Sequence, residues 1–224
     1  MTKKLRLNLP EINKALLGVE KNWRTIDDEL EEQHIGRKDI PFNSIIRTRM
    51  FAAYEYLDTL LAEGREPFAP ESLKMMLELN HLVHYGQDAR LKLKYHQAVI
   101  FSTKKFNQYI GAIHDWYKRH EKKRDPALKI AAEIYVSILG YPQLFDEGNH
   151  RTGALISSWI NVYHGYPPFV LSTDHEIAYF APSSEIKKFA DKSTWRGRRK
   201  LPKYKKSFRT FWENHLDERY IQKT

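Results

Sequence analysis

Hydrophobic residues recur every three or four positions along much of the chain, which is the spacing of one face of an α-helix. One such run lies between residues 43 and 63, and Gly64 closes it. A second run extends from residue 70 to Gly86, and a third from about residue 105 to 120. These segments predict three amphipathic helices, because glycine after a periodic run is a common helix stop.

Two later segments are almost wholly apolar. The first follows Asp125 and Pro126, a favourable helix start, and continues to Gly140. The second runs from about residue 149 to 164 and is stopped by Gly165 and two prolines. Helices that are apolar on most sides belong in a core, so these two are expected to form a buried hairpin with the polar loop 141–147 at its mouth.

The segment 95–102 contains the short apolar run Ala98-Val99-Ile100-Phe101, which predicts a small strand or hairpin. No internal repeat or low-complexity linker divides the chain. We expect an all-α protein with an N-terminal helical extension over 1–42, a core domain over 43–180 and a basic C-terminal helical segment over 181–224.

Composition excludes several kinds of chemistry. The 224 residues are 42% hydrophobic, which is enough for one sizeable core. The chain has no cysteine, so disulfides, thiolate metal sites and cysteine nucleophiles are ruled out. No stretch approaches the roughly eighteen apolar residues of a membrane span. We therefore expect a cytoplasmic protein without a membrane partner.

The net charge of +9 is concentrated in residues 186–206. This stretch contains one acid, Asp191, and ten basic residues: Lys187, Lys188, Lys192, Arg196, Arg198, Arg199, Lys200, Lys203, Lys205 and Lys206. Such a run with interleaved aromatic residues is typical of nucleic-acid binding. Because no nucleic-acid motif accompanies it, a solvated basic surface is the favoured interpretation.

The loop before the second apolar helix carries the candidate chemistry. Gly148 and the first turn of that helix leave backbone amides free to bind an anion, and Arg151 can fork onto phosphate oxygens. The predicted phosphate-binding residues are Gly148, Asn149, His150, Arg151, Thr152 and Gly153. Glu147, next to Asp146, offers a carboxylate for Mg²⁺. The alternative is purely local: the polar residues cap the helix, and Arg151 pairs with a neighbouring acid.

This loop resembles the motif of the Fic family, His-x-Phe-x-Asp/Glu-Gly-Asn-Gly-Arg-x-x-Arg, which lies between two buried helices. Five positions match, namely Phe145, Glu147, Gly148, Asn149 and Arg151. The resemblance covers roughly residues 43–171 and implies a Fic/Doc (Fido)-like helical bundle. It also implies that residues 98–100 form the family's small β-hairpin flap.

The resemblance implies an activity as well. Fic proteins mostly transfer AMP from ATP onto a hydroxyl of a target protein. By analogy Glu147 would hold Mg²⁺, the amides from Gly148 to Arg151 would cradle the phosphates of ATP, and Arg151 would neutralise charge on the leaving group. Neither the target protein nor the nucleotide base follows from these residues.

Two departures from the motif leave the activity open. Gln143 stands where the family has its catalytic histidine, and an amide cannot accept a proton near neutral pH. His150 is expected to face the phosphates or solvent rather than replace that base. Ala154 stands where many members have a second arginine; Doc kinases also lack it. The sequence thus admits three interpretations: an AMP transferase with an altered base, a Doc-like kinase, and an inactive nucleotide-binding or interaction module.

Overall fold

The computed structural model describes residues 5–35, 41–189 and 191–222, with only the backbone described at 177. Within these residues the chain forms nine α-helices, one 3₁₀ turn and two short strands. The helices are α1 (Leu9–Glu32), α2 (Ser44–Glu63), α3 (Ser72–Tyr85), α4 (Ala89–Lys94), α5 (His96–Lys122), α6 (Ala127–Leu139), α7 (Asn149–Tyr163), α8 (Glu176–Phe189) and α9 (Trp195–His215). The 3₁₀ turn η1 is Glu218–Tyr220. The predicted helical fold is confirmed.

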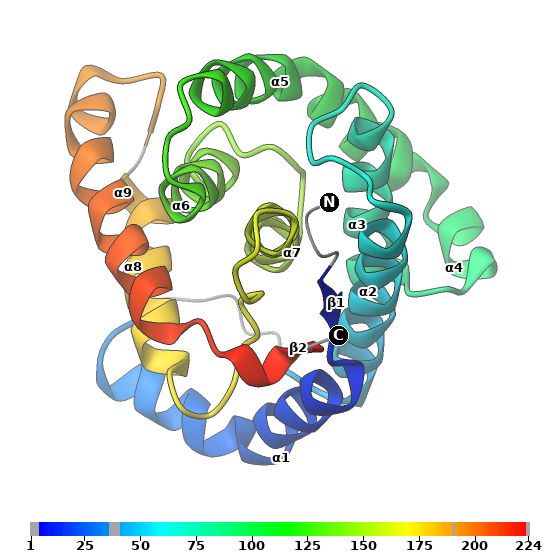
Figure 1. Cartoon of the computed structure of the whole chain (residues 1–224). Coiled ribbons are helices and arrows are strands. Elements are labelled where there is room, and N and C mark those ends of the chain that lie inside the picture. The colour runs from blue at the N-terminus through cyan, green and yellow to red at the C-terminus, as the bar shows by residue number, and fades with distance from the viewer. Residues whose placement is uncertain (1–4, 36–40, 190, 223–224) are drawn as a thin grey trace.

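Helix α7 lies at the centre of the molecule, and the other long helices surround it (Figure 1). Every residue of α7 from Thr152 to Val162 is buried. This explains the nearly continuous apolar sequence, because a helix covered on all sides cannot keep a polar face. Helix α6 packs beside it, and the two form the predicted buried hairpin.

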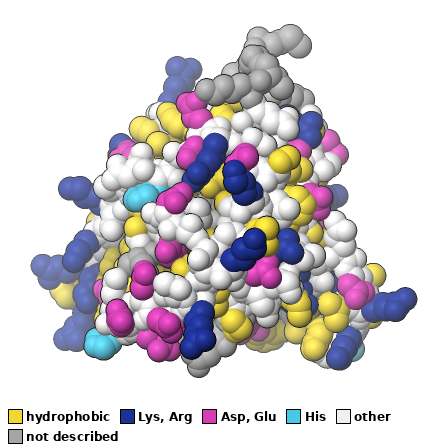
Figure 2. Space-filling model, turned by 90° about the horizontal axis from the view of Figure 1, so that it is seen from below, with side chains coloured by type: hydrophobic (Ala, Val, Ile, Leu, Met, Phe, Trp, Pro, Cys, Tyr) yellow, Lys and Arg dark blue, Asp and Glu magenta, His cyan; other side chains and the backbone are white. Residues whose placement is uncertain are grey.

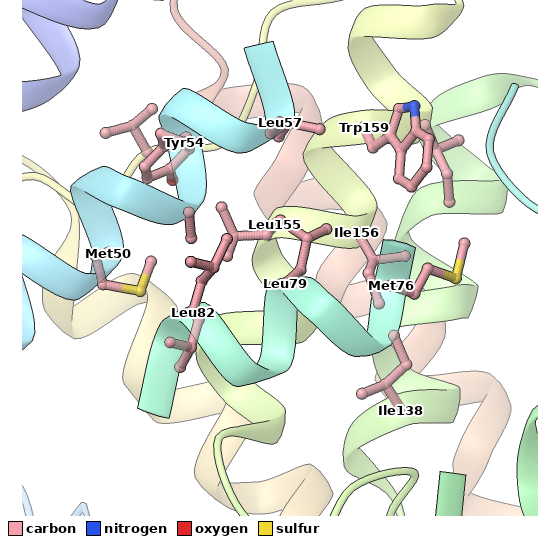
Figure 3. Packing of buried hydrophobic residues seen from close by; sticks show 14 of the residues in the cluster. Met50, Tyr54, Leu57, Met76, Leu79, Leu82, Ile138, Leu155, Ile156 and Trp159 are labelled. Carbon is pink, nitrogen blue, oxygen red and sulfur yellow. The ribbon is translucent and has the colours of Figure 1, made fainter. Parts of the chain in front are cut away.

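Helices α2 and α3 cover one side of α7. Figure 3 shows Leu79 of α3 and Leu57 of α2 close to Leu155 of α7, with Trp159 further along the same helix. Asn43 caps α2 by accepting the backbone N–H of Ile46 at 3.1 Å. Capping and the apolar spacing are local properties, so both helices begin and end close to their predicted limits.

The two ends of the described chain meet in a short antiparallel pair. Strand β1 (Arg6–Leu7) pairs with β2 (Ile221–Gln222), with Leu7 opposite Ile221. The backbone N–H of Leu7 donates to the carboxylate of Asp58 on α2 at 2.9 Å. The pair therefore ties both ends of the chain to the core.

The strand predicted over 95–102 is wrong, because residues 96–102 form the start of α5. Asp88 caps α4 by accepting the N–H of Arg90 at 2.8 Å. The buried positions of α5 are spaced three or four residues apart and begin inside the segment: Ser102, Phe106, Ile110, Ile113 and Tyr117. Helical amphipathicity therefore extends back into the run that suggested a strand, and no flap forms there.

The terminal segments pack on the core. Helix α1 lies against α2 and α8, and α9 packs on α6. Helix α8 includes residue 180, where the sequence predicts a boundary between the core domain and the C-terminal segment. The division of the chain into segments 1–42, 43–180 and 181–224 stays a prediction. No helix among the described residues is long and apolar enough to cross a membrane.

Candidate functional site

The loop between α6 and α7 turns at Gly148, which adopts the left-handed conformation with φ 74°. A Cβ atom at this position would lie 2.5 Å from Nε2 of His84 and 3.2 Å from Nδ2 of Asn80, both on α3. Conformation and close approach therefore both require glycine here. The result is a tight junction between α3 and the start of α7.

Asn149 holds the loop in shape. Its side-chain oxygen accepts the backbone N–H of Phe145 at 2.9 Å, and its amide nitrogen donates to the carbonyl of Phe145 at 3.0 Å. The same nitrogen lies 3.3 Å from Oε1 of Gln143. With Asn149 only 4% exposed, its side chain is committed to the loop. It shapes the site, and only its backbone amide remains for a ligand.

Asn80 of α3 is the second brace, and sequence analysis gave it no role. Its side-chain nitrogen donates to the carbonyl of Glu147 and to the hydroxyl of Thr152, each at 3.0 Å. Ser102 of α5 donates to its oxygen at 3.4 Å. The available clue was an asparagine on the apolar stripe of α3, since a buried amide needs polar partners. Thr152 is fully buried, so its hydroxyl serves this contact.

The backbone at the start of α7 is left open. The first helical hydrogen bond there runs from the N–H of Thr152 to the carbonyl of Gly148, 2.9 Å away. No side chain caps the helix, and the N–H groups of residues 148–151 have no acceptor among the residues that the structure describes. These groups and the helix dipole together make a positive site suited to an anion.

Arg151 adds a full charge beside these amides. Its one hydrogen bond among the described residues runs from Nη1 to the carbonyl of Val83, at 3.2 Å. Burial lowers the pKa of Arg151, and the nearby Arg49 lowers it further, while Glu147 acts in the opposite direction. Two guanidinium groups near one helix start strengthen the attraction for a negatively charged ligand.

A cavity of about 200 Å³ opens at this helix start. Residues of the loop, including Gln143, Glu147 and Arg151, line one end. The rest of the wall is mostly apolar and comes from α1, α2, α8 and the segments beside them: Leu16, Trp23, Ile35, Phe42, Ile46, Met50, Phe169, Leu171 and Phe180. The cavity therefore combines polar and charged residues of the loop with apolar and aromatic walls.

Gln143 lines this cavity with both ends of its amide in use. Its nitrogen donates to the carbonyl of Leu139 at 3.1 Å, while its oxygen accepts from Asn149. The side chain is thus a spacer between the end of α6 and the loop. It holds no basic atom toward the cavity.

His150 also lines the cavity, but its imidazole contacts the protein. Its Nδ1 lies 3.2 Å from the hydroxyl of Tyr135, which donates to the hydroxyl of Tyr179 at 2.9 Å; Tyr179 in turn donates to the backbone carbonyl of His150 at 3.2 Å. Burial lowers the pKa of His150 to about 3, with smaller contributions from Lys187 and Arg151. The ring thus contacts α6 while also lining the cavity, and the expectation that it faces phosphates or solvent stays a prediction.

Comparison with known proteins identifies the architecture. No protein-family model matches the chain, and no curated protein matches it. A solved structure of a Fic domain-containing signaling protein from Bacteroides thetaiotaomicron VPI-5482 does match, with a TM-score of 0.54 at 13% identity. The match covers 93% of this chain and 92% of that one. This chain has the Fic fold.

On the Fic fold, the two acids of the loop sit at the mouth of the cavity. Asp146 and Glu147 are both exposed and line the cavity wall, with Nζ of Lys105 4.0 Å from Asp146. No group of three His, Asp or Glu side chains among the described residues is arranged to hold a metal ion.

Proposed function

We propose that this chain is a Fic-family protein that binds a nucleotide such as ATP and acts as a nucleotide-binding module without efficient group transfer. The proposal rests mainly on the backbone N–H groups of residues 148–151, which have no acceptor among the described residues. With the side chain of Arg151, these residues line a cavity whose remaining wall is mostly apolar. Binding rests on the open amides and Arg151, whereas the lack of transfer rests on Gln143 and His150.

The polar end of the cavity favours a phosphate chain. Backbone amides at a helix start bind phosphate through directed hydrogen bonds and the helix dipole. Arg151 supplies a planar donor pair, and Lys187 of α8 lines the same cavity as a second cation. Polar side chains of the loop are engaged in bracing it, so the amides provide most of the donors.

The body of the cavity favours an organic group attached to that phosphate. Trp23, Phe42 and Phe180 line its wall, and the ring centroids of Trp23 and Phe42 lie 5.8 Å apart. Aromatic and aliphatic walls gain free energy by burying a flat apolar surface, which inorganic phosphate lacks. A nucleotide supplies both the charged chain and the flat ring.

Mg²⁺ fits this arrangement only together with the nucleotide. The ion usually takes one or two carboxylates and completes its coordination with phosphate oxygens and water. Glu147 is the residue proposed to hold it, with Asp146 beside it on the cavity wall. A bound ion would neutralise part of the phosphate charge.

Transfer onto a hydroxyl requires a group that accepts its proton, and neither candidate near the loop does so. Gln143 is an amide with both ends hydrogen bonded. His150 has its pKa lowered to about 3, so its imidazole is a poor base at neutral pH. Loss of a general base slows such reactions by about 10²–10⁴-fold. These residues support binding without rapid transfer.

Calorimetry with ATP and Mg²⁺ tests the binding. We expect Arg151→Gln to weaken ATP binding by about 10- to 100-fold, since a hydrogen bond to a charged group contributes roughly 1.5–3 kcal/mol. Arg119→Gln, the same change at an exposed position of α5, is the matched control and should leave binding unaltered. Tripolyphosphate should bind more weakly than ATP, because it lacks the ring. No binding of ATP to the wild type would refute the proposal.

A second experiment separates binding from transfer. The wild type is incubated with lysate proteins and ATP labelled at the α- or the γ-phosphate, and Gln143→His is treated in parallel. We expect no labelled protein with the wild type. An α-label on protein would show AMP transfer, and a γ-label alone would show Doc-like phosphoryl transfer. Label that appears only with Gln143→His would show that the histidine alone was missing.

A further inference from the structure

Helix α9 carries a set of cations that have no counter-charge. Six of its basic side chains are exposed, and none forms an ion pair with a residue that the structure describes: Arg196, Arg198, Arg199, Lys200, Lys203 and Lys206. Lys205 differs, since it pairs with Glu133 at 2.9 Å. Elsewhere surface cations commonly have an acid, as Arg47 has Glu20 and Lys129 has Asp125. Charge on α9 is thus left for an external anion.

These cations are gathered on the outer face of the helix. The inner face holds Tyr204, Phe208, Phe211 and Trp212, which pack in the core against α6, α7 and α8. Positions 196, 199, 200, 203 and 206 recur at helical spacing on the opposite side. At a rise of about 1.5 Å per residue the stripe is roughly 15 Å long. Basic side chains project from the left edge of Figure 2, the side where Figure 1 places α8 and α9.

No acid interrupts this stripe. The sequence from Trp195 to Trp212 contains no Asp or Glu, and the next carboxylate belongs to Glu213. Asp191, just before the helix, accepts hydrogen bonds from the backbone and hydroxyl of Ser193. Like charges at this density repel one another, and a polyanion lying across them would relieve that repulsion.

An exposed aromatic ring stands at the start of the stripe. Trp195 is 66% exposed, and the guanidinium of Arg199 lies 5.3 Å from its ring centroid. Phe189, at the end of α8, is 43% exposed and has Nζ of Lys200 4.7 Å from its ring. Flat rings bordered by cations provide stacking surfaces for bases next to contacts for phosphates. We propose that the outer face of α9, with Trp195, binds single-stranded nucleic acid.

The same features argue against a membrane surface. A helix that lies on a membrane presents an apolar face to the lipid. The apolar face of α9 is buried in the protein, and its outer stripe is cationic from Arg196 to Lys206. A single exposed indole at one end does not supply such a face.

Fluorescence anisotropy with a labelled 20-nucleotide single strand tests the surface. The logarithm of the binding constant should fall with the logarithm of salt with a slope of about −3.5, for five phosphate contacts on a single strand. Changing Arg196, Arg199 and Lys203 together to Gln should remove about two units of slope. The control changes Lys21, Lys74 and Arg119 to Gln, which lowers the net charge equally at scattered exposed sites. Equal losses in both variants would overturn the proposal, as would a wild type that does not bind.

Trp195→Ala separates recognition of bases from attraction to any polyanion. The indole should contribute about tenfold to binding of the single strand through stacking. Heparin, which has charge but no bases, should bind equally to the wild type and to this variant. If Trp195→Ala leaves single-strand binding unchanged, or if anionic vesicles bind more tightly than the strand, the nucleic-acid assignment is wrong. Arg151→Gln should leave strand binding intact, because its cavity is a separate site.

Discussion

The loop 143–152 and the outer face of α9 use backbone and side chains in opposite ways. In the loop, polar side chains such as Asn149 and Thr152 are bonded to the protein, and the amides at the start of α7 are open. In α9, the start of the helix is capped by Thr194, whose hydroxyl accepts the N–H of Gly197 at 3.1 Å, and the charged side chains are open. Both regions favour anions, but by different means.

This difference predicts how each region responds to mutation. Side chains that brace the loop are buried and hydrogen bonded, so changing them alters stability and binding together. The six exposed cations of α9 that form no ion pair support no other part of the described structure, so changing them alters binding with little effect on stability. Four substitution experiments test this contrast.

Gly148→Ala should destabilise the protein most, by about 3 kcal/mol. The left-handed conformation costs a side chain roughly 1–2 kcal/mol, and the new Cβ would meet His84 at 2.5 Å. Gly165→Ala is the matched control, because Gly165 also has a positive φ but nothing lies within 4 Å of an added Cβ. It should cost about 1 kcal/mol. Urea unfolding measures both, and equal costs would show that the contact with α3 is unimportant.

Asn149→Ala should lower the free energy of unfolding by about 2 kcal/mol, because it leaves the buried N–H of Phe145 without an acceptor. It should also weaken ATP binding, since the loop loses its shape. Asn107→Ala, at an exposed position of α5, should be neutral. If Asn149→Ala weakened binding while stability stayed constant, the side chain would be a ligand contact rather than a brace.

His150 should make stability depend on pH. Its pKa is about 3 in the folded protein and roughly 6.5 when unfolded, so the unfolded chain binds more protons between these values. Stability is therefore present above pH 6.5 and falls as the pH drops toward 3, by about 1–2 kcal/mol between pH 7 and 5. His150→Gln should reduce this decline by that amount in unfolding experiments, while the burial that lowers the pKa of His175 to about 4 leaves part of the decline in place. The exposed control His96→Gln should keep it, and a decline unchanged by His150→Gln would contradict the burial of the ring.

Neutralising Arg196, Arg199 and Lys203 should have the smallest effect, a gain of about 0.5 kcal/mol in the free energy of unfolding at low salt. Removing like charges reduces repulsion, and salt screens it with a Debye length of about 10 Å at 0.1 M. The gain should vanish in high salt and be absent from the scattered triple variant. A loss of stability would show that these side chains support the fold.

Much of the fold could be predicted because its determinants are local. Helices α2, α3, α6 and α7 follow from apolar spacing and from stops such as Gly64 and Gly140. For α5, the apolar spacing predicts a start near residue 105, whereas the helix begins at His96. Its first buried position is Ser102, a polar residue that is buried because Asn80 on another helix bonds it. A contact between helices leaves no periodic trace in the sequence.

The site was predictable in outline and not in detail. Gly148 and Arg151 are predicted to bind an anion because a glycine before a helix and a basic residue in its first turn indicate an anion site, and this role stays a prediction. The brace from Asn80, and the engagement of Gln143 by Leu139 and Asn149, depend on how α3 and α6 meet the loop. Only the folded arrangement shows which polar side chains are already in use.

Backbone chemical shifts test the central claim most directly. In ¹H–¹⁵N spectra, titration with ATP and Mg²⁺ should move the amide signals of residues 148–151 far more than those of α9. Tripolyphosphate should move the same amides, while a single-stranded oligonucleotide should move signals of α9 instead. Amides at the start of α7 that stay unchanged while ATP shifts signals of α9 would contradict the account, because the nucleotide would then bind to surface charge alone.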